Sequence, residues 1–140
     1  MSIPVELSDL QAKTGEYTWA YLLTVRPDAT PHLVSLSTQW SGHTLLMSVS
    51  AGTGRNAEAG SVVTLCYPPL DHDGYSLIVD GTASALDGDP PAGVDPIPDG
   101  KVLLSFVPTG AVLHRSAAPG FANSATGCAN DCLPVDTPTT

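Results

Sequence analysis

Residues 21–49, YLLTVRPDATPHLVSLSTQWSGHTLLMSV, decide the fold because strand patterns and turn signals alternate along them. Aromatic and branched residues recur at every second position over residues 17–25, which is typical of a half-buried β-strand. Two prolines and an aspartate then predict a turn at residues 26–31. Residues 32–40 alternate again, and the tight connection SGH leads into a second apolar run. We therefore expect one hairpin over residues 32–50.

Further strand patterns follow this region. They cover residues 61–67, the long stretch 75–86, and residues 101–115 as a last strand or bent pair of strands. The break at residues 87–100 is rich in proline and glycine, which excludes regular structure. At the other end of the chain, residues 2–17 are expected to form a short helix. About six strands with hairpin spacing and only short helices indicate a mainly β protein built as a closed or nearly closed antiparallel barrel.

The size and charge of the chain exclude several classes of function. Its 140 residues suffice for one domain, which we place at residues 1–116. A small, polar tail over residues 117–140 is expected to be mobile or to pack on a partner. The net charge of -9 argues against nucleic acid and membrane surfaces as partners, since both are anionic. No apolar stretch long enough to span a bilayer and no secretory pattern occurs, so we expect a cytoplasmic protein.

The order of these elements resembles a known family. The chain begins with a short helix, followed by the pattern of residues 21–49, a loop ending in GRN at residues 54–56, SVVTLCYPP and a long strand. This order is similar to that of the pyridoxamine 5'-phosphate oxidase-like split-barrel family in its small single-domain form. The match covers roughly residues 8–85 and is carried again at SFVPTGAVLHR, residues 105–115. The resemblance implies a six-stranded antiparallel split β-barrel with short helices, Greek-key-like. It also implies a homodimer that binds FMN, or the deazaflavin coenzyme F-420, in a groove between subunits, while some members bind or degrade haem.

The glycine-rich stretch SAGTGRNAEAG, residues 50–60, is the expected phosphate anchor under this resemblance. Gly54, like the glycine two residues before it, permits a positive φ and brings N–H groups close to an anion, and the following helix offers unpaired N–H donors. Arg55 can grip a phosphate with two parallel hydrogen bonds, and Asn56 can cap the helix or reach the ribityl chain. Thr53 stands where family members often carry a basic residue, so Arg55 is expected to act with Thr53, Ser50 and backbone donors. The alternative from the residues alone is a surface turn with a solvated arginine.

Two strands and the closing strand supply the other expected cofactor contacts. By resemblance, the strand HLVSLSTQW lies against the flavin ring edge and offers backbone groups and small hydroxyl side chains. The facing strand would flank the ring and the ribityl chain. His114, on the closing strand, would reach towards the cofactor of the other subunit. The residues expected to contact the cofactor on these strands are Ser35, Leu36, Ser37, Thr38, Met47, Ser48, Val49, Ser50 and His114.

The other histidines and the cysteines indicate no site. His32 begins a strand, His43 lies in a turn and His72 lies in the acidic break LDHDG, so each is expected to face solvent. Cys128 and Cys132 form C-x3-C, and two thiols without two further ligands do not make a structural zinc site, so we expect no metal. The chain holds no Gly-x-Ser-x-Gly and no P-loop, which leaves hydrolase and nucleotidase functions without support.

Together these features favour a flavin- or deazaflavin-binding oxidoreductase that transfers hydride to or from a small organic substrate. No catalytic side chain is assigned, because the cofactor does the chemistry. Two alternatives stay open: a non-catalytic module that binds or sequesters FMN, haem or another planar ligand, and a degenerate barrel with no cofactor. A homodimer is also expected because Tyr17, Trp19 and Trp40 would otherwise be exposed.

Overall fold

The structure is a computed structural model and describes residues 2–116. Its helices are the 3-10 helix η1 (Leu7–Asp9), α1 (Leu10–Thr14) and α2 (Ala51–Ala59). Its strands are β1 (Ser2–Pro4), β2 (Ala20–Val25), β3 (Pro31–Leu36), β4 (Gln39–Ser41), β5 (Thr44–Ser50), β6 (Val63–Tyr67), β7 (Ser76–Leu86) and β8 (Lys101–His114). The expected mainly β antiparallel fold with few short helices is confirmed. The tail expected at residues 117–140 lies outside the described residues.

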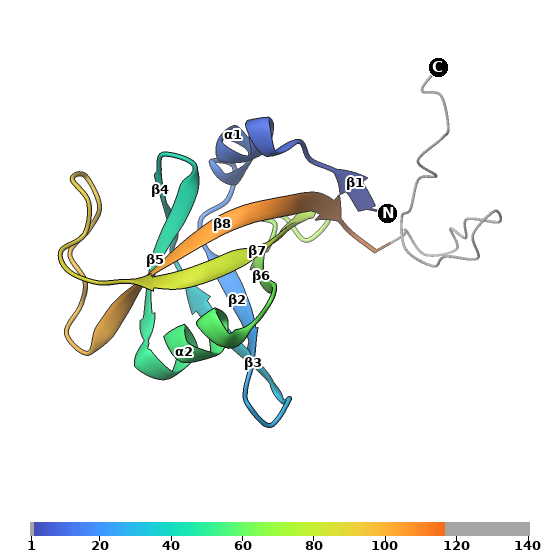
Figure 1. Cartoon of the computed structure of the whole chain (residues 1–140). Coiled ribbons are helices and arrows are strands. Elements are labelled where there is room, and N and C mark those ends of the chain that lie inside the picture. The colour runs from blue at the N-terminus through green and yellow to red at the C-terminus, as the bar shows by residue number, and fades with distance from the viewer. Residues whose placement is uncertain (1, 117–140) are drawn as a thin grey trace, which may run out of the picture.

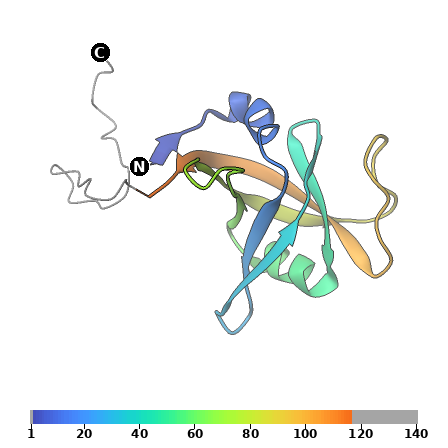
Figure 2. The ribbon, with the colours of Figure 1, turned by 180° about the vertical axis from the view of Figure 1, so that it is seen from behind.

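All eight strands belong to one sheet with the order β3-β2-β6-β7-β8-β5-β4, and β1 also pairs with β8. The long β7 and β8 run side by side through the middle of the molecule (Figures 1 and 2). Six of the strands are longer than three residues, so the count exceeds six only through the short β1 and β4. Within residues 2–116 no strand pairing joins β3 to β4 or β5, and the sheet stays open along this seam.

The seam exists because residues 32–50 do not form one hairpin, which makes that prediction wrong. β3 pairs with β2, with Leu33 opposite Leu23, through a turn closed by the Arg26 N–H donating to the Thr30 carbonyl at 2.9 Å. The chain then leaves β3 at Ser37 and starts a separate hairpin, β4–β5. Its two-residue turn has Gly42 at a φ of 60°, a left-handed conformation that glycine adopts without strain.

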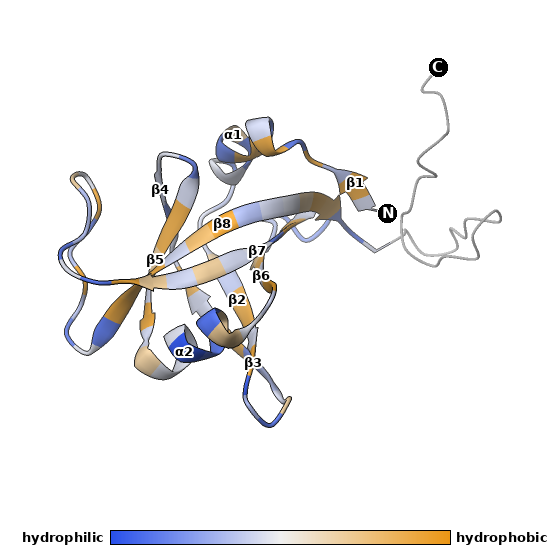
Figure 3. Cartoon of the chain, viewed as in Figure 1, coloured by the Kyte–Doolittle hydropathy of each residue, from blue (hydrophilic) through white to orange (hydrophobic). Residues whose placement is uncertain are grey.

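The core lies between the inner faces of the sheet and under the helices. On β2 the buried residues are Ala20, Leu22 and Thr24, whereas Leu23 and Val25 face out. Larger core side chains come from β5, β6, β7 and β8 and include Leu45, Met47, Leu65, Leu77, Val79, Leu104 and Phe106. Hydrophobic and hydrophilic residues alternate along the strands, and α2 carries a hydrophilic patch (Figure 3). The loop over residues 87–100 has no helix or strand, as expected.

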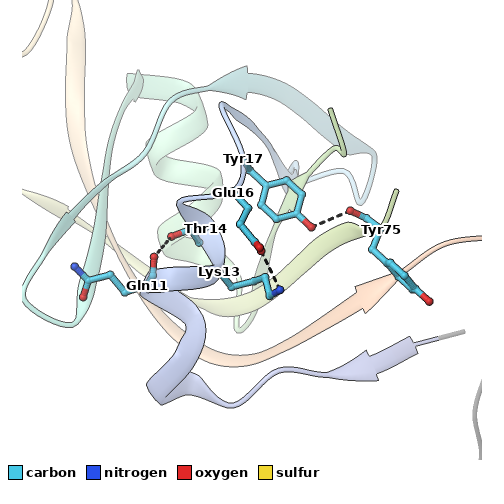
Figure 4. A network of polar contacts seen from close by, with 6 residues as sticks. All are labelled: Gln11, Lys13, Thr14, Glu16, Tyr17 and Tyr75. Atoms are coloured by element: carbon cyan, nitrogen blue, oxygen red, sulfur yellow. Dashed lines mark hydrogen bonds and ion pairs between the residues drawn. The ribbon is translucent and has the colours of Figure 1, made fainter. Parts of the chain in front are cut away.

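The N-terminal segment is only partly helical, because Ser2–Pro4 extend as β1 along β8 and the helix begins later than expected. α1 lies on the opposite side of the β7–β8 ribbon from α2 (Figures 1 and 2). Its end is held by a Lys13–Glu16 ion pair of 2.9 Å and by the Tyr17 hydroxyl, which donates to the Tyr75 carbonyl at 2.9 Å (Figure 4). No helix in residues 2–116 is long and apolar enough to cross a membrane.

Candidate functional site

A groove of about 270 Å³ lies in the open seam of the sheet. One wall comes from the end of β3 and the residue after it, and the opposite wall comes from β5. Residues 94–98 cover the groove, and the Asp95 N–H donates to the Gln39 side chain at 2.9 Å, which holds this cover in place. The lining residues are Ser35, Leu36, Ser37, Gln39, Leu46, Met47, Ser48, Val94, Asp95, Pro96, Pro98 and Leu103.

Ser35, Leu36 and Ser37 also line a second hollow of about 300 Å³, whose other residues are Trp19 and Tyr21. The rings of Trp19 and Tyr21 stack edge to face with centroids 4.6 Å apart. β3 is an edge strand, so its outer N–H and C=O groups have no sheet partner within the described residues. The segment from Ser35 to Ser37 therefore offers backbone and hydroxyl groups to both hollows.

The outer face of the β2–β3 hairpin is apolar and exposed. Trp19 is 36% exposed and Leu33 is 56% exposed, and Leu23 and Val25 lie on the same face. Trp19 is therefore exposed as expected. Tyr17 and Trp40 are not, since both pack partly buried against the core and the Trp40 Nε1–H donates to the Thr14 hydroxyl at 2.8 Å. An apolar face of this kind is a feature of surfaces that contact another protein.

The glycine-rich stretch is a helix rather than a loop. Ser50 caps α2, because its Oγ accepts the Thr53 N–H at 3.2 Å. The left-handed backbone expected at Gly52 and Gly54 is not observed, since neither residue has a positive φ. Gly54 instead fits a tight contact: a Cβ there would lie 3.0 Å from Cγ2 of Val102. Asn56 lies inside the helix and does not cap its start, which corrects that prediction.

Two cations lie beside the first turn of α2. The Arg55 side chain folds back towards Gly52, with its Nη2 3.8 Å from the position that a Gly52 Cβ would take. Lys101 is the cross-strand partner of Ser50. Paired residues in a ladder point to the same face, so Lys101 shares a face with Ser50, Ser48 and Leu103. Within residues 2–116, neither cation makes a hydrogen bond or ion pair. The N-terminus of α2 adds its own partial positive charge.

Lys101 was missed by the sequence reasoning. It lies far from Ser50 in the chain and follows a loop with no regular structure, so no local pattern connects the two residues. Only the β5–β8 register brings them together. A chain with five Lys and Arg residues thus has two of them at one helix N-terminus.

His32 does not face solvent freely, which corrects the sequence-based expectation. It is half-buried, and its Nδ1 lies 2.8 Å from Nη2 of Arg26. Its Nε2 lies 3.4 Å from Oγ1 of Thr53. The β2–β3 hairpin is therefore linked through His32 to the first turn of α2.

Thr38 and Val49 contribute differently from the other predicted residues. The Thr38 hydroxyl lies 2.7 Å from the hydroxyl of Tyr67 and lines neither hollow. Burial raises the pKa of Tyr67, and the hydrogen bond with Thr38 offsets part of that effect. Val49 is buried under α2, so only its backbone could meet a ligand.

The structure does not bring His114 to this site within one chain. It lies at the far end of β8 from Lys101, and its Nδ1 is 3.2 Å from the Ser2 hydroxyl. His43 lines a separate hollow beside Trp40, and His72 is exposed with Nε2 3.2 Å from a carboxylate oxygen of Asp73. Cys66 is a free thiol, while Cys128 and Cys132 lie outside the described residues. Across residues 2–116, no group of three or more His, Cys, Asp or Glu side chains is arranged to hold a metal ion.

Solved structures with the same fold define its class. The structure matches an F420 reductase at TM-score 0.55 and 21% identity, over 72% of this chain and 94% of that one. It matches the FAD binding protein of Mycobacterium smegmatis at TM-score 0.61 and 16% identity, over 78% of this chain and 95% of that one. A candidate pyridoxamine 5'-phosphate oxidase of Listeria innocua matches at TM-score 0.59 and 17% identity, over 76% of this chain and 96% of that one. HutZ, a haem storage protein of Vibrio cholerae, matches at TM-score 0.57 and 14% identity, over 75% of this chain and 91% of that one. The fold is that of the pyridoxamine 5'-phosphate oxidase-like split barrels.

Curated sequences place the chain more closely. It belongs to the same family as two mycobacterial proteins named as uncharacterized, Mb0449c of Mycobacterium bovis and MT0457 of Mycobacterium tuberculosis. The chain is 38% identical to each over 144 residues, which covers 96% of this chain and 96% of each relative. No protein-family model matches the sequence.

Proposed function

We propose that this chain is a flavin- or deazaflavin-binding oxidoreductase acting on a small organic substrate. The observation that carries the proposal is the continuity between the seam groove and the first turn of α2. Ser48 lines the groove, and Ser50, two residues further along the same strand, caps α2. Arg55 belongs to this helix, and Lys101 is the cross-strand partner of Ser50. A ligand with a flat ring and a phosphate needs a hollow with hydrogen-bonding edges next to a positive anchor.

The residues present fit such a ligand. The side chains of Arg55 and Lys101 have no competing partner in residues 2–116, and the start of α2 adds backbone N–H groups that have no partner within the helix. Ser35, Ser37 and Ser48 would hold the polar edge of the ring, while Leu36, Met47 and Leu103 form apolar walls. When bound, a flavin or deazaflavin supplies hydride transfer. The chain's own residues bind and orient it, and residues 94–98 exclude water from one side of the groove.

FMN and F-420 both fit this description, since each joins a flat ring to a phosphate. The solved structures with this fold include proteins named for F420 and FAD, which supports this class of ligand. Haem receives less support from the site, because no histidine or cysteine of residues 2–116 lines the seam groove.

The proposal includes a homodimer. Each hollow alone lies at or below the lower end of the roughly 300–1,000 Å³ range of ligand sites. The second hollow includes Trp19 of the exposed apolar face formed by Trp19, Leu23, Val25 and Leu33, and it shares Ser35–Ser37 with the seam groove. A second copy packed on this face would bury it and would enlarge the site around Ser35–Ser37.

Titration of the purified chain with FMN, riboflavin and F-420, followed by flavin fluorescence and absorbance, tests the proposal. Saturable binding of FMN or F-420, tighter than binding of riboflavin, supports it. Unchanged spectra with all three would refute it. Oxidation of the reduced cofactor by candidate acceptors then separates an oxidoreductase from a non-catalytic binding module.

A further inference from the structure

The loop between β7 and β8 forms one side of the seam groove. It covers residues 87–100 and extends away from the ends of the two strands (Figure 1). Four of its residues belong to the groove lining, namely Val94, Asp95, Pro96 and Pro98. A loop of this length without a helix or strand is uncommon in a compact domain, and such loops usually act as lids, binding loops or linkers. This loop is not a linker, because it joins two paired strands of one sheet.

The middle of the loop is stiff. Four of its positions are prolines, which fix φ, namely Pro90, Pro91, Pro96 and Pro98. Two turns stiffen it further. The Val94 N–H donates to the Pro91 carbonyl at 3.1 Å, and the Lys101 N–H donates to the Pro98 carbonyl at 3.1 Å. Residues 89–99, which we call the strap, should therefore move as one piece.

Glycines with a left-handed backbone flank the strap. Gly88 has a φ of 88° and Gly100 a φ of 77°. A Cβ at either position would meet nothing within 4 Å, so conformation and not packing explains these glycines. Gly93 also has a positive φ, of 84°, but it lies inside the turn from Pro91 to Val94, whose hydrogen bond holds it. Glycine changes φ at little steric cost, so Gly88 and Gly100 suit hinges.

Few contacts hold the strap over the groove. No residue of the strap is buried: Pro90, Val94 and Ile97 are half-buried, and the others are exposed. The Asp95 N–H donates to Oε1 of Gln39 at 2.9 Å. Within residues 2–116, this is the only hydrogen bond between the strap and any element other than the start of β8. Because one neutral hydrogen bond adds little net stability, the strap can detach without disturbing the core.

The acceptor of this bond is fixed to the barrel. Gln39 is the first residue of β4 and lines the groove. The preceding residue, Thr38, has its hydroxyl 2.7 Å from the hydroxyl of Tyr67. Tyr67 is buried in the core, so Thr38 anchors the start of β4. Gln39 therefore stays in place when the strap moves, and a molecule in the groove would lie against both.

We propose that the strap opens and closes the seam groove about Gly88 and Gly100, and that Gln39 is the positioning residue that latches it closed. The inference rests on the proposed function, because the groove is that of the proposed ligand. Opening admits the ring of the ligand, and closing covers the ring and slows its release. The latch is a backbone N–H, so the carboxylate of Asp95 takes no part in it.

Gln39→Leu, which removes the acceptor, tests the latch against Gln39→Glu, which keeps a side-chain oxygen. Gln11→Leu makes the same change on α1, outside the groove. Exchange of the residue 95 amide with water is measured by NMR without ligand. Release rates of FMN and riboflavin are measured by stopped-flow fluorescence. Thermal unfolding of each variant measures its stability separately.

In ligand-free wild type, the residue 95 amide should exchange about 3- to 10-fold more slowly than in Gln39→Leu, as expected for one neutral hydrogen bond. Gln39→Glu should recover most of this protection, and Gln11→Leu should match wild type. FMN and riboflavin should both leave Gln39→Leu about 3- to 10-fold faster than they leave wild type, because the strap covers the groove and not the phosphate anchor. A Gln39 with only a structural role would lower the stability without changing the residue 95 amide.

Gly88→Ala tests the hinge, with Gly110→Ala as a control in β8 at a glycine without a positive φ. A side chain at a φ of 88° strains the closed backbone, so exchange of the residue 95 amide should rise about 2- to 5-fold in Gly88→Ala. Exchange equal to that of the control would refute a hinge at Gly88.

The possible failures are distinguishable. If flavin binds but Gln39→Leu changes neither the residue 95 amide nor the release rates, the latch is refuted and the proposed function stands. A change in the amide with unaltered release rates would likewise refute the strap as a gate. If no flavin or deazaflavin binds but the amide is protected in a Gln39-dependent way, the latch stands and the proposed function fails. If there is neither binding nor protection, both are refuted.

Discussion

Gly81 of β7 lies directly against the ring of Phe106 of β8: a Cβ at position 81 would be 2.5 Å from Cζ of that ring and 2.4 Å from the Val107 carbonyl oxygen. The β7–β8 register shifts at this point, between Asp80 and Gly81. Because Phe106 is fully buried, its ring cannot move aside without disturbing the core.

Gly81→Ala should therefore destabilise the protein by about 1–3 kcal/mol, the usual cost of forcing extra atoms into a packed site. Urea unfolding monitored by tryptophan fluorescence measures the change. Gly110→Ala is a matched control in the same strand pair, since a Cβ at position 110 meets nothing within 4 Å. Equal stabilities of the two variants would contradict the packing argument.

Arg55→Ala should weaken FMN binding by roughly 10- to 100-fold, the loss expected for a hydrogen bond to a charged group. Lys101→Ala should cause a smaller loss of about 3- to 10-fold, because a lysine acts on phosphate as a point charge. Fluorescence titration at low and high salt measures both, and salt should reduce the two effects. Lys13→Ala, at the α1 end of the molecule, should bind FMN as wild type does. A loss in that variant would show that net charge alone sets the affinity.

Tyr67 should make the protein less stable in alkali. Burial raises the pKa of Tyr67 in the folded state above its ordinary value of 10.0. Above about pH 10, the unfolded chain loses this proton while the folded chain keeps it, so ionisation favours unfolding. The contribution is present below pH 10 and is lost as the pH rises towards the folded-state pKa. Tyr67→Phe should therefore lose less stability between pH 9 and 11 than wild type does. Chemical unfolding at each pH tests this, and parallel curves for the two proteins would contradict it.

Leu33→Asp should dissociate the proposed homodimer, because it places a charge in the middle of the exposed face of the β2–β3 hairpin. Leu33 is 56% exposed, so the folded monomer should tolerate the change. Leu70→Asp is the matched control, since Leu70 is 72% exposed but lies in the loop between β6 and β7. Sedimentation velocity at micromolar concentration should give a dimer for wild type and the control, and a monomer for Leu33→Asp. A monomeric wild type would refute the dimer.

The sequence predicted the class of the fold because period-two patterns survive in the strands, as they do over residues 20–25. It did not predict the break at Ser37, since β3 turns to pair with β2 and that choice depends on contacts made elsewhere in the sheet. The sequence predicted a loop up to residues 54–56 and a helix only after it, because two glycines weaken the helix signal over the first half of α2, although Ser50 is a favourable cap.

Four of the residues expected to contact a cofactor lie close together, at the end of β3, just after it and on β5. Ser35, Leu36, Ser37 and Ser48 do line one groove. Thr38 does not, because Tyr67 holds its hydroxyl, and a partner 29 residues away leaves no trace in a local pattern. The position of Lys101 beside Ser50 follows only from the β5–β8 register, and the position of His32 beside Thr53 follows only from a tertiary contact. Each was visible only once the chain had been folded.

The open edge of β3 should make its outward amide protons exchange quickly with solvent. Amide protons in the middle of the sheet are held by ladder bonds on both sides, whereas the outward amides of β3 face the seam and should exchange with deuterium oxide far sooner. A ligand or a second copy seated along Ser35–Ser37 would take up those amides. The rate of isotope exchange in one short strand would thus report occupancy of the groove without any need for turnover.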